Sequence, residues 1–319
     1  MQSFKSPSTR LLGNIVLGAL FVFQPLNAAK AEDTVKVFIL AGQSNMEGHG
    51  VITADPARNE GKGSLEHAAR KDLGNAEIGQ WLASDGSWKE RSDVWIHYLN
   101  RHGKLRPGFG VNEDRIGPEL GFGAVMGTQY QEPVLLIKLA WGGKSLAKDF
   151  RPPSAVGGQT GDYYQLVIRD TQKVLANFKT LFPELSGKQL ELIGFGWHQG
   201  WNDRVNQSFN DAYQENMTHF IHDIRRDLQH PSLPFVIAET GMSGYEEKHP
   251  RAVSLMAAQK AVADQEEFKG NVAFVETKPF YRSADQSPSG QAYHWNTNAE
   301  TYYLIGQAMA EALNKLQSK

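Results

Sequence analysis

The sequence contains no cysteine among its 319 residues. Disulfide bonds, thiolate metal sites and a lipid-modified cysteine are therefore excluded. Apart from one run near the N-terminus, no apolar segment approaches the length of a membrane span. The 33 basic residues are outnumbered by 35 acidic ones, which argues against a nucleic-acid partner or an anionic membrane surface. What is present, with 40% apolar and 21% charged residues, is the composition of an ordinary globular protein.

The first 31 residues differ from the rest of the chain. Lys5 and Arg10 precede an apolar run over residues 11–23, and the segment ends in "AKA". This order predicts a signal peptide, residues 1–31, cleaved after Ala31 from a secreted or periplasmic protein. The alternatives are an N-terminal membrane anchor or a disordered leader. Cleavage removes three positive charges and no acid, so the formal net charge falls from −2 to −5, and no membrane partner is expected afterwards.

Five short apolar runs recur along the chain, each bounded by turn residues. Each has the length and β-branched content of a strand buried on both faces: residues 35–41, 134–140, 190–196, 234–238 and 271–275. Helical periodicity appears between them, most clearly over residues 209–228. This alternation predicts an α/β protein, a three-layer α/β/α sandwich with a five-stranded parallel sheet.

We predict one domain over residues 32–319, with a long loop-rich insertion at about residues 51–116. The insertion is rich in Gly, Asp, Asn and Lys and carries several aromatic side chains. These could stack on a sugar, but a small satellite core is the favoured interpretation. The last helix is expected to begin at "TNAE", because Thr297 and Glu300 have the spacing of a capping box.

Ligands of open parallel sheets bind beyond the carboxyl ends of the strands. The loops expected there are "GQSNMEG", "WGGKSL" and "WHQGWND", all rich in glycine, amide and hydroxyl groups. Ser44 lies in the first loop, where a helix could begin. It can cap that helix or act as a nucleophile, because free N–H groups and a helix dipole favour both roles. Position alone leaves both interpretations open.

A serine nucleophile needs a base within hydrogen-bond reach. Two of the ten histidines lie in loops suited to this: His198, after the third strand, and His294, in "QAYHWNTNAE". A late histidine that folds back over the first strand's loop is a familiar layout of serine hydrolases. His219 and His222 are one helical turn apart but have no third ligand at metal spacing, so neither a metal site nor a cofactor is expected.

Four sequence blocks resemble the SGNH hydrolase superfamily, and within it the sialate O-acetylesterase and acetylxylan esterase group known as carbohydrate esterase family six. The blocks are "GQSNM" (42–46), "WGGKSL" (141–146), "WHQGWND" (197–203) and "HWNTNAETYYLIG" (294–306). They follow the family's order over nearly the whole mature chain. The resemblance implies the flavodoxin-like SGNH hydrolase fold and a carboxylic ester hydrolase that needs no metal or organic cofactor.

The resemblance also implies roles for individual residues. Ser44 becomes the nucleophile, and His294 the general base and then the general acid. The oxyanion hole consists of the Ser44 N–H, the Gly143 N–H and the Gln199 amide, with Asn202 as the alternative amide. Further side chains of the blocks, and one acid outside them, are expected to line the substrate pocket: Gln43, Asn45, Glu119, His198 and Trp201.

Two positions depart from the family's pattern. Gln291 stands where the family usually has an aspartate, three residues before the histidine. The triad acid therefore comes from elsewhere, is replaced by a backbone carbonyl, or is missing; Glu276 and Glu47 are the candidates. Trp201 stands where many relatives have glutamate, and it can either line the acyl or sugar pocket or pack in the core.

The sequence thus predicts an exported serine esterase that removes O-acetyl groups from sialate or from an acetylated plant or algal polysaccharide. Its expected partner is a small-molecule or polysaccharide acetyl ester, and the oligomeric state is left open. One alternative is an esterase or lipase acting on other short-chain esters. The absence of an aspartate at Gln291 motivates another, a non-catalytic carbohydrate-binding relative.

Overall fold

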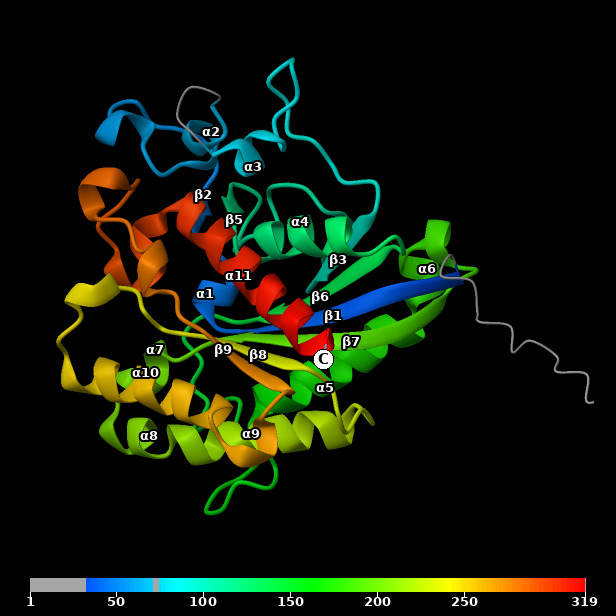
Figure 1. Cartoon of the computed structure of the whole chain (residues 1–319), viewed down its shortest axis with the longest axis vertical. Helices are drawn as coiled ribbons and strands as arrows, with labels where there is room; N and C mark the ends of the chain where they lie inside the picture. The colour runs from blue at the N-terminus through cyan, green and yellow to red at the C-terminus, as the bar shows by residue number, and fades with distance from the viewer. Residues whose placement is uncertain (1–32, 71–74, 319) are drawn as a thin grey trace, which may run out of the picture. The chain divides into compact units, whose positions relative to one another are not determined.

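The computed structural model describes residues 33–70 and 75–318, and the predicted signal peptide lies outside this part of the chain. In the described part a seven-stranded sheet has the order β4-β3-β6-β1-β7-β8-β9 (Figure 1). β4 pairs antiparallel with β3, and the other neighbouring strands are parallel. A small second sheet pairs β2 with β5. The strands are β1 (Thr34–Gly42), β2 (Gly50–Val51), β3 (Val94–Tyr98), β4 (Arg101–Lys104), β5 (Arg115–Ile116), β6 (Val134–Ala140), β7 (Gln189–His198), β8 (Phe235–Ala238) and β9 (Val272–Val275).

Helices cover both faces of the large sheet. Figure 1 shows α4 and α11 on one side of it, and α5, α9 and α10 on the other. No helix of the described residues is long and apolar enough to cross a membrane. The helices are α1 (Ser44–Glu47), α2 (Leu65–Ala68), α3 (Ala76–Gly79), α4 (Glu119–Gln129), α5 (Asp162–Ala176), α6 (Phe178–Leu181), α7 (Trp201–Arg204), α8 (Gln207–Asp211), α9 (Tyr213–Asp227), α10 (Pro250–Ala263) and α11 (Ala299–Gln317), and a 3₁₀ segment, η8 (Ala292–Thr297), precedes the last of them.

The three-layer α/β/α architecture is confirmed, and the five predicted strands are β1, β6, β7, β8 and β9. The predicted strand count is wrong by two, because β3 and β4, from the loop-rich stretch, extend the sheet beyond β6. β4 reads "RHGK" and has no apolar residue, so no periodic signal marks it. The aromatic side chains of this stretch, Trp81, Trp95, Tyr98 and Phe109 among them, join the main core instead of forming a satellite.

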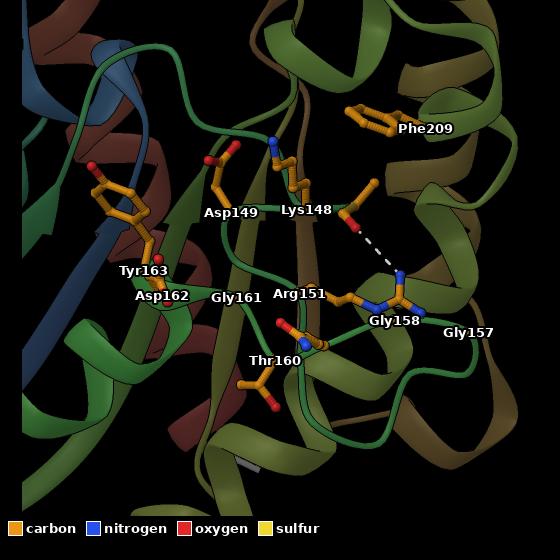
Figure 2. A pocket seen from close by; sticks show the side chains of 12 residues that line it. Lys148, Asp149, Arg151, Gly157, Gly158, Thr160, Gly161, Asp162, Tyr163 and Phe209 are labelled. Carbon is orange, nitrogen blue, oxygen red and sulfur yellow. Dashed lines mark hydrogen bonds between the residues drawn. The ribbon is translucent and has the colours of Figure 1, made fainter.

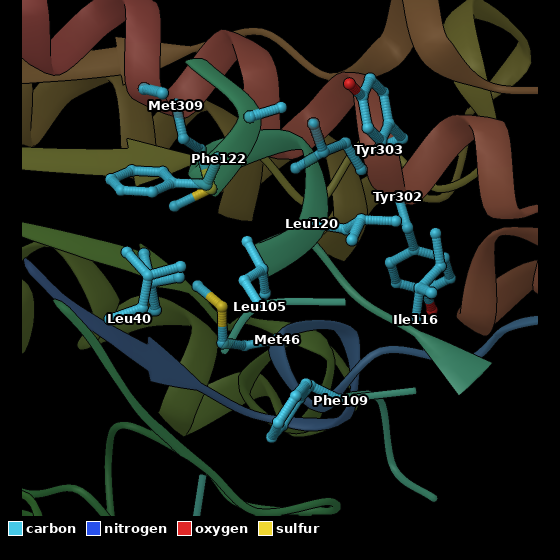
Figure 3. Close-up of a cluster of buried hydrophobic side chains, with 14 of the residues drawn as sticks. Leu40, Met46, Leu105, Phe109, Ile116, Leu120, Phe122, Tyr302, Tyr303 and Met309 are labelled. Carbon is cyan, nitrogen blue, oxygen red and sulfur yellow. The ribbon is translucent and has the colours of Figure 1, made fainter. Parts of the chain in front are cut away.

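The apolar alternation of β1 builds a core on each face of the sheet. Phe38 and Leu40 belong to the cluster under α4 and α11, whereas Val37 and Ile39 belong to the cluster under α5, α9 and α10. Figure 3 shows the first cluster, in which Met46 of α1 packs with side chains of the sheet, α4 and α11. Burying one such side chain stabilises a fold by roughly 1.5–3 kcal/mol. The core therefore anchors α1, the helix that begins at Ser44.

Glycine allows α4 and α11 to approach each other closely. A Cβ atom on Gly121 of α4 would lie 2.0 Å from the carbonyl oxygen of Tyr303, and one on Gly306 would lie 1.9 Å from the carbonyl oxygen of Pro118. No larger residue fits at either position without separating the helices. Gly306, the last residue of the fourth block, thus fixes where α11 crosses α4.

The expected start of the last helix is wrong by one residue. Asn298 is the N-cap of α11, and its Oδ1 accepts the N–H of Thr301 at 3.1 Å. Thr297 has a left-handed φ of 56° and cannot take the extended conformation of a cap. Glu300 pairs with Arg282 instead, with Nε and Oε2 3.3 Å apart.

Candidate active site

The three polar loops meet because β1, β6 and β7 end at the same level. Gly42 at the end of β1 pairs with Ala140 on one side and with His198 on the other. Beyond the strands, the Gln43 N–H donates to the His198 carbonyl at 3.2 Å, and the Trp141 N–H donates to the Gly42 carbonyl at 3.2 Å. The first three blocks therefore form one continuous polar edge.

Ser44 is the first residue of α1, and it is 9% exposed. The N-cap is Gln43, whose side chain reaches the third block: its Oε1 accepts the N–H groups of Gly200 at 3.0 Å and Asn202 at 3.4 Å. Neither the hydroxyl nor the N–H of Ser44 hydrogen-bonds to another described residue. Since α1 has only one turn, this N–H, more than a helix dipole, can stabilise an oxyanion beside the serine.

A buried ion pair holds α1 from below. Lys138, in the middle of β6, donates from Nζ to the Glu47 carbonyl at 2.6 Å and to the Phe109 carbonyl at 2.7 Å. Its third partner is the Glu119 carboxylate at 2.7 Å, and both side chains are buried. Burial lowers the pKa of Lys138, which Glu119 opposes. Glu119, expected to line the pocket, thus lies beneath α1, the helix that begins at Ser44.

The loop after β6 passes directly over Ser44. A Cβ atom on Gly142 would lie 3.8 Å from the Ser44 Cβ and 3.0 Å from the Glu47 Oε2. Gly143 has a left-handed φ of 69°, and its carbonyl accepts the Asn202 Nδ2 at 2.6 Å. This places the predicted oxyanion donors Gly143 and Asn202 side by side, one residue beyond the glycine that approaches the serine.

Gln199 lies behind these groups and holds two loops together. Its Nε2 donates to the Lys144 carbonyl at 3.0 Å and to the Asp203 Oδ2 at 2.6 Å, and its Oε1 is buried without a partner among the described residues. Asp203 also accepts the N–H groups of Leu146 at 2.8 Å and Ala147 at 2.9 Å. Burial raises the pKa of Asp203 to about 6, although these donors favour its ionised form. Both amide protons of Gln199 are therefore engaged.

His294 is tied to the residue that follows Ser44. Asn45 Nδ2 donates to the Tyr293 carbonyl at 3.1 Å, and the Tyr302 hydroxyl donates to Asn45 Oδ1 at 2.8 Å and to the His294 carbonyl at 3.3 Å. The fourth block is thus clamped onto the first through a buried amide, which makes Asn45 a bridge more than a pocket wall.

The His294 ring is suited to the role of base. Burial lowers its pKa to about 4, so it is neutral near pH 7. Its Nδ1 is buried and has no hydrogen-bond partner in the described part of the chain. The next residues, Trp295, Asn296 and Thr297, all have φ values near +50°, a conformation that costs non-glycine residues energy. Such strain persists where the surroundings impose it, often at functional sites.

No carboxylate of the described residues hydrogen-bonds to the His294 ring. The Gln291 side chain is exposed, and only its carbonyl meets His294, accepting the backbone N–H at 2.8 Å. The Glu276 side chain is 48% exposed and pairs with Lys278 at 3.6 Å. Glu47 is nearer: its Oε2 lies 4.0 Å from the Nε2 of His49, whose ring stacks on the ring of His294. The structure therefore does not bring Glu276 to the histidine and brings Glu47 only to its neighbour.

The remaining predicted pocket residues divide into two groups. His198 is fully buried, neither ring nitrogen has a partner among the described residues, and burial lowers its pKa to about 3. This makes it a core residue and not a rival base. Trp201 is half-buried, with its ring 5.4 Å from that of Tyr293. Together with Tyr293 it forms an aromatic wall next to His294.

A hollow of about 550 Å³ is lined by residues between Ala147 and Tyr163, further along the loop that carries Gly143, and by Phe209. Figure 2 shows Lys148, Arg151, Tyr163 and Phe209 around it. It begins at Ala147, whose N–H is bonded to Asp203. In the described residues, no group of three or more histidine, aspartate or glutamate side chains is placed to hold a metal ion.

Residues 34–315 match the family model described as "SASA: Carbohydrate esterase, sialic acid-specific acetylesterase". The chain belongs to this family. It is a carboxylic ester hydrolase of the carbohydrate acetylesterase type, and the resemblance to SGNH sialate O-acetylesterases is confirmed. Among proteins with curated descriptions, none matches it significantly.

Solved structures share the esterase fold at low sequence identity. A protein from Arabidopsis thaliana superposes with a TM-score of 0.58 at 18% identity, over 88% of this chain and 97% of that one. NanS superposes with a TM-score of 0.56 at 15% identity, over 90% and 98%. A carbohydrate acetylesterase from Xanthomonas citri gives 0.51 at 13% identity, over 86% of this chain and 56% of that one.

The sequence assigned no role to several residues that shape this site. Asp203 and Tyr302 lie inside the blocks, but their partners are remote in sequence. Lys138 interrupts the apolar run of β6, a strand expected to be buried on both faces. A lysine at such a position needs a buried partner, and this was a signal in the sequence. His49, two residues beyond Glu47, stacks on the His294 ring.

Proposed function

We propose that the protein is an exported serine esterase that removes O-acetyl groups from a carbohydrate through an acyl-enzyme on Ser44. The observation that carries this proposal is the clamp of Asn45 and Tyr302, which joins the His294 loop to the residue after Ser44. A serine with an unengaged N–H, a neutral histidine and a glycine-amide pair are the parts that acyl transfer requires.

The reaction proceeds in two halves. Ser44 Oγ attacks the acetyl carbonyl carbon while His294 takes the hydroxyl proton, and the oxyanion is stabilised by the N–H groups of Ser44 and Gly143 and by an amide side chain. When the tetrahedral intermediate collapses, His294 gives its proton to the departing sugar oxygen, and the acetyl group stays on Ser44. Water, deprotonated by His294, then attacks the acyl carbon, and His294 returns the proton to Ser44 Oγ as acetate leaves.

The amide that completes the oxyanion hole is Asn202. One of its two amide protons is bonded to the Gly143 carbonyl, which leaves the other for the substrate. Gln199 has no proton left, because both serve Lys144 and Asp203. The contacts therefore favour Asn202, the alternative by sequence, over Gln199.

We assign the glycan part of the substrate to the hollow that begins at Ala147, further along the loop that carries Gly143. Tyr163 and Phe209 offer aromatic surface to sugar rings, while Lys148 and Arg151 offer hydrogen-bond donors to sugar oxygens. Lys144, next to Gly143, lies 4.5 Å above the Tyr163 ring and so connects the hollow to the oxyanion loop.

The proposal that the protein is exported rests on the predicted signal peptide. If the peptide is cleaved after Ala31, N-terminal sequencing of the secreted protein should begin at Glu32.

The test is acetate release from O-acetylated sialic acid, acetylated xylan and acetylated pectin by the mature protein. At least one substrate should be deacetylated, and Ser44→Ala should lose this turnover while keeping the native melting temperature. Unchanged turnover in Ser44→Ala would refute the mechanism. Glycan binding without acetate release would favour the alternative of a non-catalytic carbohydrate-binding protein, which is suggested by Gln291 standing where the family usually has an aspartate. A series of nitrophenyl esters of increasing acyl length separates an acetylesterase from a short-chain lipase.

A further inference from the structure

The His49 ring lies flat on the ring of His294. The two ring centroids are 3.7 Å apart and the planes differ by 10°. His49 stands in "MEGHG", just beyond the nucleophile helix, and 245 residues before its partner in the chain. No carboxylate of the described residues hydrogen-bonds to the His294 ring. Of the ring contacts that His294 makes with described residues, the one with His49 is the shortest.

Both histidines are fastened at the backbone by one hydroxyl. The Tyr302 hydroxyl hydrogen-bonds to the His294 carbonyl at 3.3 Å and to the backbone of His49. Tyr302 is itself fully buried in the core under α11. The stack is therefore anchored on both sides by the same rigid side chain and does not depend on mobile surface groups.

We propose that His49 is the positioning residue for His294, and that its ring takes the orienting role of the missing triad carboxylate. This inference rests on the proposed function, in which His294 is the base. A flat neighbour at 3.7 Å prevents the imidazole from tilting out of its plane, so that its nitrogen stays aligned while it takes and returns a proton. A neutral ring face also stabilises the imidazolium that forms in the transition state.

Burial is the main reason that both rings of the stack are neutral. It lowers the pKa of His49 to about 3, and His294 of η8, Arg115 of β5 and Lys138 of β6 act in the same direction. The Glu47 carboxylate of α1 lies 4.0 Å from its Nε2, and burial raises the pKa of Glu47. On the other side, Tyr293 packs against His294, whose pKa is about 4. Both rings are therefore neutral near pH 7, and the single proton of the proposed reaction goes to His294, the base that it assigns.

Three variants separate the flat ring from mere space filling. His49→Phe keeps an aromatic face, His49→Leu fills the space without one, and His49→Ala opens the space to water. We expect kcat to fall about ten- to a hundredfold in the Leu and Ala variants, with KM within about threefold, and most of kcat to return in the Phe variant. His222→Ala, at a histidine that is half exposed on α9, is the matched control and should equal the wild type.

The pH profile distinguishes positioning from loss of fold. Water admitted by His49→Ala raises the pKa of His294 towards 6.5, so the acid limb of kcat/KM should move to higher pH, whereas His49→Phe should leave it in place. Circular dichroism of each variant over the same pH range separates this shift from acid unfolding, which would lower the rate and the helical signal together.

Wild-type kcat in His49→Leu, or a His49→Phe variant as slow as His49→Ala, would overturn the inference while Ser44→Ala remained inactive. If Ser44→Ala were fully active, the proposed function and the inference would both fall.

Discussion

The two amide side chains of the third block face different partners, and this difference divides their roles. Asn202 is partly exposed beside Gly143, whereas Gln199 is buried against Asp203. A donor that meets only the developing oxyanion contributes to kcat and leaves KM nearly unchanged. A buried amide that joins loops contributes to the stability of the site.

We therefore predict that Asn202→Ala lowers kcat about a hundred- to a thousandfold with little change in KM, since that is the usual effect of losing one oxyanion donor. Gln199→Ala, in contrast, should lower the urea midpoint of unfolding, because it leaves the buried Asp203 carboxylate without one of its hydrogen-bond donors. Steady-state kinetics on an acetyl ester and urea unfolding measure both. A full kcat in Asn202→Ala would return the oxyanion role to Gln199.

At the scale of elements, the start of α11 determines where the loop that carries His294 ends. Asn298 caps the helix and also donates from Nδ2 to the Gln286 carbonyl at 3.1 Å and to Ser287 Oγ at 3.0 Å, in a buried environment. The three left-handed residues before it are held in place between this cap and the His294 clamp.

Asn298→Ala should therefore destabilise the protein by about 2 kcal/mol or more, since loss of a cap alone typically costs about 1 kcal/mol and further buried bonds are lost. Thr297→Ala is the matched control one residue earlier, at the position that the sequence pattern suggested. It should cost less, because within residues 33–70 and 75–318 its hydroxyl bonds only to the neighbouring Asn296 carbonyl. Urea midpoints of the two variants decide, and equal losses would contradict the assignment of the cap.

Sequence reasoning succeeded where a local pattern determines the structure. β1, β6, β7, β8 and β9 are continuous apolar runs, and such runs have few alternatives to buried parallel strands. β3 and β4 were missed because the pairing of β3 with β6 joins segments whose surroundings read as loop. The capping residue was missed because the choice between Thr297 and Asn298 depends on backbone dihedrals imposed by tertiary contacts.

At the scale of the whole molecule, the blocks pointed to Ser44, Gly143 and His294, and the fold brings their loops to one sheet edge. The contacts that complete the site could not be predicted from the sequence. The His49 ring meets a partner 245 residues away, and Asp203 accepts donors from a loop more than fifty residues earlier. No spacing rule encodes such pairs, because they depend on how the layers pack.

The fold also keeps several histidines neutral, which makes its stability depend on pH. Burial lowers the pKa of His49 and His198 to about 3, and that of His97 and His294 to about 4. In the unfolded chain these groups titrate near 6.5. Below that pH the unfolded state binds more protons than the folded state, so stability falls as pH decreases from 6.5 to about 4. Asp203, whose pKa burial raises to about 6, and Glu47, whose pKa burial also raises, act in the opposite direction but are outnumbered by the four histidines.

We predict that the urea midpoint is lower at pH 5 than at pH 7. One histidine that stays neutral contributes a slope of about 1.4 kcal/mol per pH unit in this range. His198→Phe removes a buried imidazole with two unpaired nitrogens and leaves the other three histidines in place, so it should reduce the slope by about that amount. His97→Phe offers a second measurement at a different face of the sheet. If neither variant changed the slope, the buried histidines would not be the origin of the pH dependence.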